Sequence, residues 1–433
     1  MKRYFGIIIL FFTSGYAYCN SDGNQGNDSA KEQQSHKSEW KIGAPIVTYW
    51  SGPGSNKPLG GKEAAQVCAG GWNLAWAQNK NDLDELRRHG IRGMLVIGTP
   101  DIQDAAQAKN LAALIEKVSA HPALYAYHLV DEPGTGAFPK LARLVAFLRQ
   151  RDPAHTAYIN LFPTYANEAQ LGVSDDAAER ARVGYPQDFA GVNTDDKTAM
   201  RYREYLRQFI DIVKPDLISY DHYHFLKNSD GIQYFLNLSL IRKAALDANL
   251  PFLNIIQACD SPAEGWRGPN ENEVRWLTFT SLAYGAQGIS HFRYDIGLWE
   301  NATTPRPLYW EVARINRDFL AMATQLQPLT SLGAYHCGKA PLGGEALPPD
   351  SPFSPDPFSQ EILLGYFGKE ENKPTHVVVV NLDYKNAVSI TLKGPAPMDL
   401  YHAPTRTWRA DKGGSRVKLD IQPGGGALAR LRE

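Results

Sequence analysis

An alternation of short apolar runs with amphipathic stretches, repeated eight times between residues 44 and 328, limits what this chain can fold into more than any other feature. Apolar runs bounded by turn residues indicate buried strands, and the stretches that follow them place apolar residues at helical spacing. Because a helical crossover leaves consecutive strands parallel, eight such units in series predict a closed barrel. The predicted strands are 44–50, 71–77, 91–98, 124–132, 157–165, 217–225, 252–259 and 288–295.

The C-terminal part of the chain has a different rhythm. A Pro-, Ser- and Gly-rich segment at 341–360 is followed by short strand-like runs separated by turn residues, and no helical pattern fits between them. Closely spaced strands of this kind indicate antiparallel pairing and a β-sandwich. The sequence therefore predicts an α/β fold, with a (β/α)8 TIM barrel at 41–330 and a C-terminal antiparallel β-sandwich domain at 331–433.

The N-terminus resembles an export signal. Two basic residues precede an apolar run at 4–12, which is too short to span a bilayer as a helix, and small residues follow it. We expect residues 1–19 to be a signal peptide and the mature protein to be secreted or periplasmic. Residues 20–40 are too polar to bury a core and are expected to be a disordered linker. Cleavage after Ala17 would leave Cys19 near the new terminus, and the sequence leaves open whether Cys19 carries a lipid anchor to the outer membrane.

Composition excludes several classes of function. The formal net charge is −1, so no overall positive field would attract nucleic acid. The segment 51–54, after the first strand, lacks the glycine spacing of a dinucleotide-binding loop. Cys68, Cys259 and Cys337 show no metal-binding spacing, so buried thiols are expected, and no metal or cofactor is implied.

One predicted strand ends in two adjacent acids. The run LYAYHLVDEPG at 124–134 is apolar and aromatic up to Asp131 and Glu132, and Pro133 then prevents further strand pairing. Two carboxylates at the end of a buried strand cost desolvation energy unless they are used. One use is catalysis. The other is the start of the next helix, because Asp, Glu and Pro are all favourable there.

In a (β/α)8 barrel the reactive groups lie at the carboxyl ends of the strands. The residues predicted to lie there, beside Asp131 and Glu132, are Tyr49, Trp50, Asn73, Asn160, Asp221, Tyr223, Gln257, His291 and Arg293. Sugars require this mixture, because their hydroxyls bind amides and carboxylates while their apolar ring faces stack on aromatic planes. Arg293 is a lone cation in an apolar strand and is expected to bond a carboxylate, that of Asp221, Asp295 or the substrate.

Three stretches resemble clan A glycoside hydrolases, whose fourth barrel strand ends in an Asn-Glu-Pro type motif. By that match Glu132 is the general acid/base, and Asp131 stands where the family has an Asn that binds the sugar. The run WLTFTSLAYGAQGISHFRYD at 276–295 is similar to bacterial β-galactosidase-like barrels of the same clan, and 377–431 resembles the small β-sandwich that often follows them. The resemblance implies an enzyme that hydrolyses an oligo- or polysaccharide.

The chain departs from the clan at strand seven, where Gln257 stands in place of the nucleophilic Glu. Three interpretations remain. In the first, Glu132 is the general acid and Asp221 the base or nucleophile. A separation of roughly 6.5–9.5 Å between the carboxyls would mean inversion, which we favour, and about 5 Å would mean retention. In the second, the Asp131-Glu132 pair resembles that of hexosaminidases and implies substrate-assisted hydrolysis of an N-acetylated sugar. In the third, the protein binds glycan without cleaving it.

Overall fold

A computed structural model of the chain describes residues 44–173, 194–301, 303–358 and 361–432. The expected signal peptide, the linker and the anchor site at Cys19 lie outside the described residues. Within the described part of the chain, no helix combines the length and the apolarity needed to cross a membrane.

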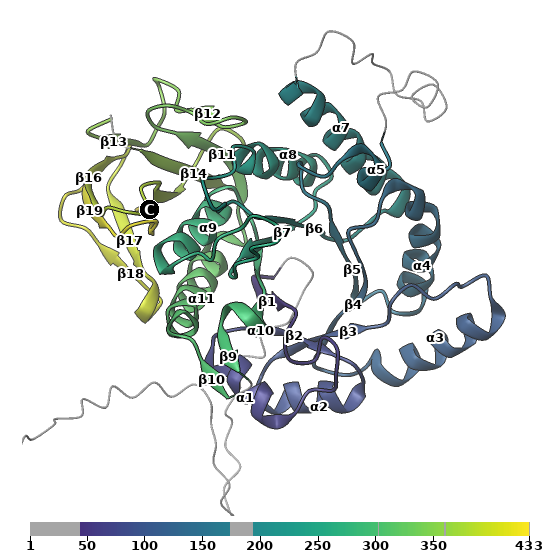
Figure 1. Cartoon of the computed structure of the whole chain (residues 1–433). Coiled ribbons are helices and arrows are strands. Elements are labelled where there is room, and N and C mark those ends of the chain that lie inside the picture. The colour runs from purple at the N-terminus through teal and green to yellow at the C-terminus, as the bar shows by residue number, and fades with distance from the viewer. Residues whose placement is uncertain (1–43, 174–193, 302, 359–360, 433) are drawn as a thin grey trace, which may run out of the picture. The chain divides into compact units, whose positions relative to one another are not determined.

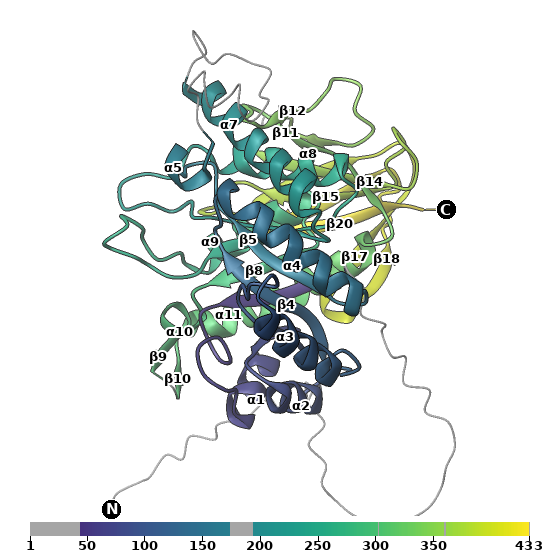
Figure 2. The same ribbon diagram turned by 90° about the vertical axis from the view of Figure 1, so that its right-hand side faces the viewer.

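Eight parallel strands form a ring, and helices surround it on the outside (Figures 1 and 2). Pairing runs in the order β1-β8-β7-β6-β5-β4-β3-β2. Most residues of these strands are buried on both faces, because helices cover the outside and side chains fill the interior. The predicted (β/α)8 barrel is confirmed. The strands are β1 (Ile46–Trp50), β2 (Leu74–Ala77), β3 (Arg92–Val96), β4 (Leu124–Asp131), β5 (Thr156–Leu161), β6 (Ile218–His222), β7 (Phe252–Gln257) and β8 (Gly288–Phe292).

Asn73 closes the ring between β1 and β2. Its backbone N–H donates to the carbonyl of Val47 at 3.1 Å, and its Oδ1 accepts from the Val47 N–H at 2.8 Å. Its Nδ2 donates to the carbonyl of Pro45 at 3.0 Å. Asn73 precedes the first residue of β2, so it lies at the amino ends of the strands. The prediction that Asn73 binds substrate at the carboxyl ends is therefore wrong.

The helices alternate with the strands as predicted. Residues 174–193, within the long connection after β5, lie outside the described residues. The helices are α1 (Gly61–Ala69), α2 (Lys80–Arg88), α3 (Ala105–Val118), α4 (Phe138–Arg151), α5 (Glu168–Leu171), α7 (Thr194–Gln208), α8 (Tyr234–Asp247), α9 (Glu271–Ala283), α10 (Tyr294–Gly297) and α11 (Pro307–Leu326), with short helical turns η1 (Thr135–Ala137), η2 (Phe209–Val213) and η3 (Ala403–Thr405).

The C-terminal strands form two facing sheets, which confirms the predicted sandwich. A seven-stranded sheet has the order β12-β11-β14-β15-β20-β17-β18, and a three-stranded sheet has the order β13-β16-β19. Alternate residues of β19 are buried, which is the pattern of a strand with one face on a core. The strands are β11 (Thr330–His336), β12 (Glu345–Ala346), β13 (Ser354–Asp356), β14 (Ile362–Gly368), β15 (His376–Asn381), β16 (Val388–Lys393), β17 (Met398–His402), β18 (Thr407–Ala410), β19 (Arg416–Ile421) and β20 (Gly426–Leu431); β9 (Trp299–Asn301) and β10 (Thr304–Pro305) form a small hairpin after β8.

Helix α9 lies between the barrel and the sandwich and contacts both (Figure 1). Every residue from Glu273 to Ala283 is buried, because neither side of this helix faces solvent. Two glycines allow the sandwich backbone to touch the helix. A Cβ at Gly365 would lie 2.2 Å from the Ala283 carbonyl oxygen, and one at Gly424 would lie 2.2 Å from that of Asn272. The close backbone approach fixes the sandwich against the barrel.

Candidate active site

Two carboxyl groups meet at the carboxyl ends of β4 and β6. Glu132 follows the last residue of β4, and its backbone N–H donates to the carbonyl of Asn160 at 2.9 Å. Its φ of 44° lies in the left-handed region, which turns the chain sharply before Pro133. Asp221 lies within β6 and is 3% exposed. The carboxyl groups of Glu132 and Asp221 are joined by a direct hydrogen bond.

Asn160 on β5 ties this pair to the neighbouring acid. Its Nδ2 donates to Oδ1 of Asp221 at 2.9 Å and to Oδ1 of Asp131 at 3.0 Å. Its Oδ1 accepts from the hydroxyl of Ser219 at 3.0 Å, and Ser219 is bonded in turn to the hydroxyl of Tyr158 at 2.7 Å. Both amide protons and the carbonyl are therefore used inside the protein. The Asn160 side chain therefore holds Asp131 and Asp221, and its expected contact with substrate is not supported.

Burial and mutual repulsion weaken the acidity of these groups. Desolvation and the charge of Asp131 raise the pKa of Glu132 to about 7. Full burial, together with the charges of Glu132 and Asp131, raises the pKa of Asp221 well above its usual range. Asp131 reaches solvent, but the surrounding protein displaces enough water to raise its pKa, against the opposing bond from Asn160. Near neutral pH the Glu132–Asp221 pair therefore shares a proton in its hydrogen bond.

The direct contact corrects the expected separation of the two carboxyls. Inverting enzymes keep them roughly 6.5–9.5 Å apart so that a water molecule fits between them. The carboxyls of Glu132 and Asp221 instead interact directly through a hydrogen bond. A direct hydrogen bond between the carboxyls is closer to the separation of about 5 Å found in retaining enzymes than to that of inverting enzymes.

Aromatic rings form a wall beside the acids. The ring of Tyr223 lies 4.4 Å from that of Trp266 and 4.8 Å from that of Phe292, measured between centroids. Burial, followed by charges that include those of Asp221, Asp131 and Glu132, raises the pKa of Tyr223, which directly follows β6 and is two residues from Asp221. Trp266 and Phe292 keep partial exposure. We define the aromatic wall as Tyr223, Trp266 and Phe292.

Trp266 was missed because it lies in the loop after β7, where no strand pattern draws attention to it. Trp50 was predicted to lie at the mouth of the barrel. Its side chain is buried against other aromatic rings, and its ring lies 5.0 Å from that of Trp76 and 5.4 Å from that of His128 between centroids. His128 is a second residue that the sequence reasoning missed. Its Nε2 is buried without a hydrogen-bond partner, and burial lowers its pKa to about 4, so the ring is neutral at pH 7.

Two other predicted residues are internal. Tyr49 is fully buried, and its hydroxyl donates to the carbonyl of Pro53 at 2.7 Å. His291 is also fully buried, and the indole N–H of Trp72 donates to its Nδ1 at 3.3 Å. The prediction that Tyr49 and His291 bind substrate is not supported, since neither side chain reaches solvent.

The side chain of Gln257 hydrogen-bonds the loop after β6 and the loop after β7. Its Oε1 accepts from the Phe225 N–H at 2.8 Å, and its Nε2 donates to the carbonyls of Phe225 at 3.1 Å and Arg267 at 2.7 Å. The side chain is fully buried, so the expected contact with substrate is excluded. A carboxylate could not make the two donor bonds, which explains the amide at this position.

Arg293 bonds a carboxylate, as expected, and its partner is Asp295. Its Nη2 lies 2.7 Å and its Nε 3.0 Å from the carboxylate oxygens of Asp295. This pairing raises the pKa of Arg293. Both side chains are partly exposed, so the pair contributes little to stability.

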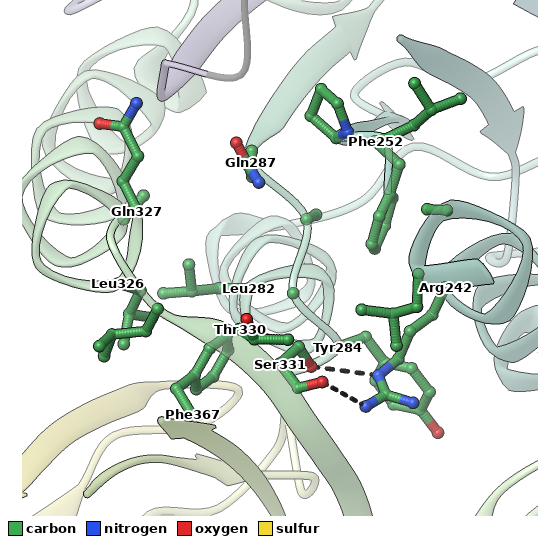
Figure 3. A pocket seen from close by; sticks show the side chains of 18 of the residues that line it. Arg242, Phe252, Leu282, Tyr284, Gln287, Leu326, Gln327, Thr330, Ser331 and Phe367 are labelled. Carbon is green, nitrogen blue, oxygen red and sulfur yellow. Dashed lines mark hydrogen bonds between the residues drawn. The ribbon is translucent and has the colours of Figure 1, made fainter. Parts of the chain in front are cut away.

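The cavity in Figure 3 lies at the other end of the barrel. It encloses about 470 Å³ and is lined by residues at the amino ends of β7 and β8, such as Phe252 and Gln287, and by Phe367 of the sandwich. In Figure 3 Arg242 donates to Ser331 from Nε at 3.1 Å and from Nη2 at 3.0 Å. None of the acids above lines it. Among the described residues, no cluster of His, Cys, Asp and Glu could hold a metal ion.

No family profile matches this chain, and no curated protein sequence matches it. Among solved structures it is similar to a glycoside hydrolase family 5 protein from Bacteroides vulgatus, with a TM-score of 0.53, 10% identity, and coverage of 89% of this chain and 88% of that one. It is similar also to a protein described as a glycoside hydrolase, with a TM-score of 0.52, 11% identity, and coverage of 89% and 92%. The chain shares its fold with these two solved structures. The resemblance to clan A-like barrels is thus confirmed for the architecture.

Proposed function

We propose that the protein is a glycoside hydrolase, with Glu132 as the general acid and Asp221 as its carboxylate partner. The observation that carries the proposal is the hydrogen-bonded pair at the carboxyl ends of β4 and β6, in which Glu132 has a pKa of about 7. A general acid works best when its pKa lies near the operating pH. Burial and like charges are the usual means of raising a carboxyl pKa this far.

The short separation favours a retaining reaction in two steps. Glu132 donates its proton to the glycosidic oxygen as the bond to the anomeric carbon breaks, and Asp221 bonds that carbon. Glu132 then takes a proton from water, and the resulting hydroxide displaces Asp221. The substrate must first replace the mutual hydrogen bond, so that each carboxyl turns to its own reacting atom. Asn160 helps to keep Asp221 oriented, because its Nδ2 donates to Oδ1 of that carboxyl.

The substrate class follows from the surroundings of the pair. The aromatic wall offers partly exposed ring surface beside the acids, and stacking on such rings suits the apolar face of a sugar. Asp131 is exposed at the mouth and can accept from a sugar hydroxyl. We propose an oligo- or polysaccharide substrate. We propose also that the N-terminal segment exports the protein; intact-mass analysis of the mature protein would test this and would show whether Cys19 is retained and carries a lipid.

Glu132→Gln tests the assignment. The wild-type protein is screened against plant, host and bacterial glycans, and reducing ends are measured for the responsive substrate. We expect Glu132→Gln to lower kcat by about 10²–10⁴-fold, because the amide cannot donate the proton. Glu116→Gln is the matched control, since Glu116 lies exposed on α3, far from the pair.

Two results would contradict the proposal. An unchanged rate in Glu132→Gln would remove Glu132 from the mechanism. Retardation by glycans in affinity gels with no release of reducing ends would indicate a binding protein instead. Proton NMR of the first product anomer tests the stereochemistry, and an inverted product would exclude Asp221 as nucleophile.

A further inference from the structure

The loops after β6 and β7 form one unit, and this unit carries the aromatic wall. The Lys227 N–H donates to the Gly265 carbonyl at 3.0 Å, and the Arg267 N–H donates to the Phe225 carbonyl at 3.1 Å. The buried amide of Gln257 joins the same two loops from below. Trp266 therefore moves only if the loop after β6 moves with it.

Arg267, the neighbour of Trp266, is held from three directions. Its Nη1 donates to the Glu273 carboxylate at 2.8 Å, in the first turn of α9. Its guanidinium lies over the ring of Phe225, 4.7 Å from the centroid. Its Nη2 donates to Oδ1 of Asp230 at 3.3 Å, in the loop after β6. The orientation of the loop after β7 thus depends on where Asp230 is held.

The sandwich domain holds Asp230. Tyr384, in the turn between β15 and β16, donates its hydroxyl to Oδ2 of Asp230, and its ring meets that of Phe225 edge-on at 5.6 Å. The turn itself is rigid, because the Asp383 carboxylate accepts from the Lys385 N–H at 2.7 Å and from the Asn386 N–H at 2.9 Å. A fixed point on the sandwich is therefore bonded to the loops that form the wall.

We propose that Tyr384 of the β-sandwich is a positioning residue for substrate, which holds the aromatic wall in place through Asp230 and Arg267. The sandwich then completes the substrate-binding side of the barrel mouth without touching substrate itself. That the aromatic wall binds a sugar rests on the proposed function. The connection from Tyr384 through Asp230 and Arg267 to Trp266 is independent of the proposed function.

Tyr384→Phe tests the link, because it removes one hydroxyl and keeps the ring against Phe225. Hydrogen–deuterium exchange of the full chain is measured without ligand. We expect exchange in 226–232 and 261–269 to rise about tenfold or more, since a bond to a charged group is lost. Tyr366→Phe is the matched control. It removes a buried tyrosine hydroxyl that bonds the Phe353 carbonyl inside the sandwich, so it weakens that domain without touching Asp230.

A rise confined to Tyr384→Phe supports the proposal. Unchanged exchange in both loops, or an equal rise in both variants, overturns it. If the wild type hydrolyses an aryl glycoside from a panel of glucosides, galactosides and mannosides, Tyr384→Phe should raise KM about three- to tenfold and change kcat less than twofold. The effect should be much smaller in a Trp266→Ala background, because both changes act on the same wall. Absence of any hydrolysis would count against the proposed function, while the exchange experiment would still decide the link.

Discussion

The raised pKa of Glu132 makes a prediction about stability that needs no substrate. The unfolded chain releases the Glu132 proton near pH 4.5, whereas the folded protein keeps it until about pH 7. Between these values the folded state binds more protons than the unfolded state, so the free energy of unfolding falls as the pH rises. The stabilisation is fully present below pH 4.5 and is lost as the pH passes about 7. Glu132→Gln removes the titrating group and should abolish this part of the pH dependence.

The size of the effect follows from the shift. A rise from 4.5 to about 7 corresponds to about 3.5 kcal/mol at roughly 1.4 kcal/mol per pKa unit. Glu132 keeps some contact with solvent, and screening reduces this to about 1–2 kcal/mol. We therefore expect Glu132→Gln to match the wild type near pH 4 and to be about 1–2 kcal/mol more stable at pH 8.

Urea denaturation at intervals from pH 4 to pH 8 measures the difference between the two proteins. Asp318, whose pKa is raised to about 6 by desolvation and whose charged neighbours do not include the pair, is present in both proteins and cancels. Glu116→Gln should follow the wild type at every pH. A Glu132→Gln protein that is no more stable than the wild type at pH 8, or a difference that does not grow with pH, would refute the electrostatic account of the site.

Two further changes test residues around the pair. Asn160→Leu removes both N–H donors and should lower kcat by about 10- to 100-fold, since these hydrogen bonds orient Asp221 and Asp131. Ser219→Ala keeps both donors and should lower kcat far less in the same assay. Equal losses of kcat in the two variants would show that Asn160 does not position the carboxyls. Gln257→Glu restores the residue type that clan A carries at strand seven, yet it buries an acid without its two donor bonds. We expect Gln257→Glu to lower the free energy of unfolding by about 3 kcal/mol or more and not to increase hydrolysis. A stable variant with increased turnover would contradict the structural role of the Gln257 amide.

The architecture could be predicted because its signals are local. The apolar runs that became β1 to β8 and the turn-separated runs that became the sandwich each show their period within a short window of sequence. The placement of Glu132 and Asp221 at the carboxyl ends follows from the same pattern, since parallel barrel strands end at one rim. Trp266 could not be found this way, because it belongs to a loop that faces the pair only through its bonds with another loop.

The barrel, the sandwich and the strands that carry the acids can be predicted from the sequence, because hydrophobic period and turn chemistry act between near neighbours in the chain. Which polar side chains remain available for a ligand depends on the folded chain. Asn160 gives its amide to two carboxylates, and Gln257 gives its amide to two loops. A buried polar group is committed to whichever donor or acceptor the folded chain brings beside it, and that partner comes from segments far apart in the sequence.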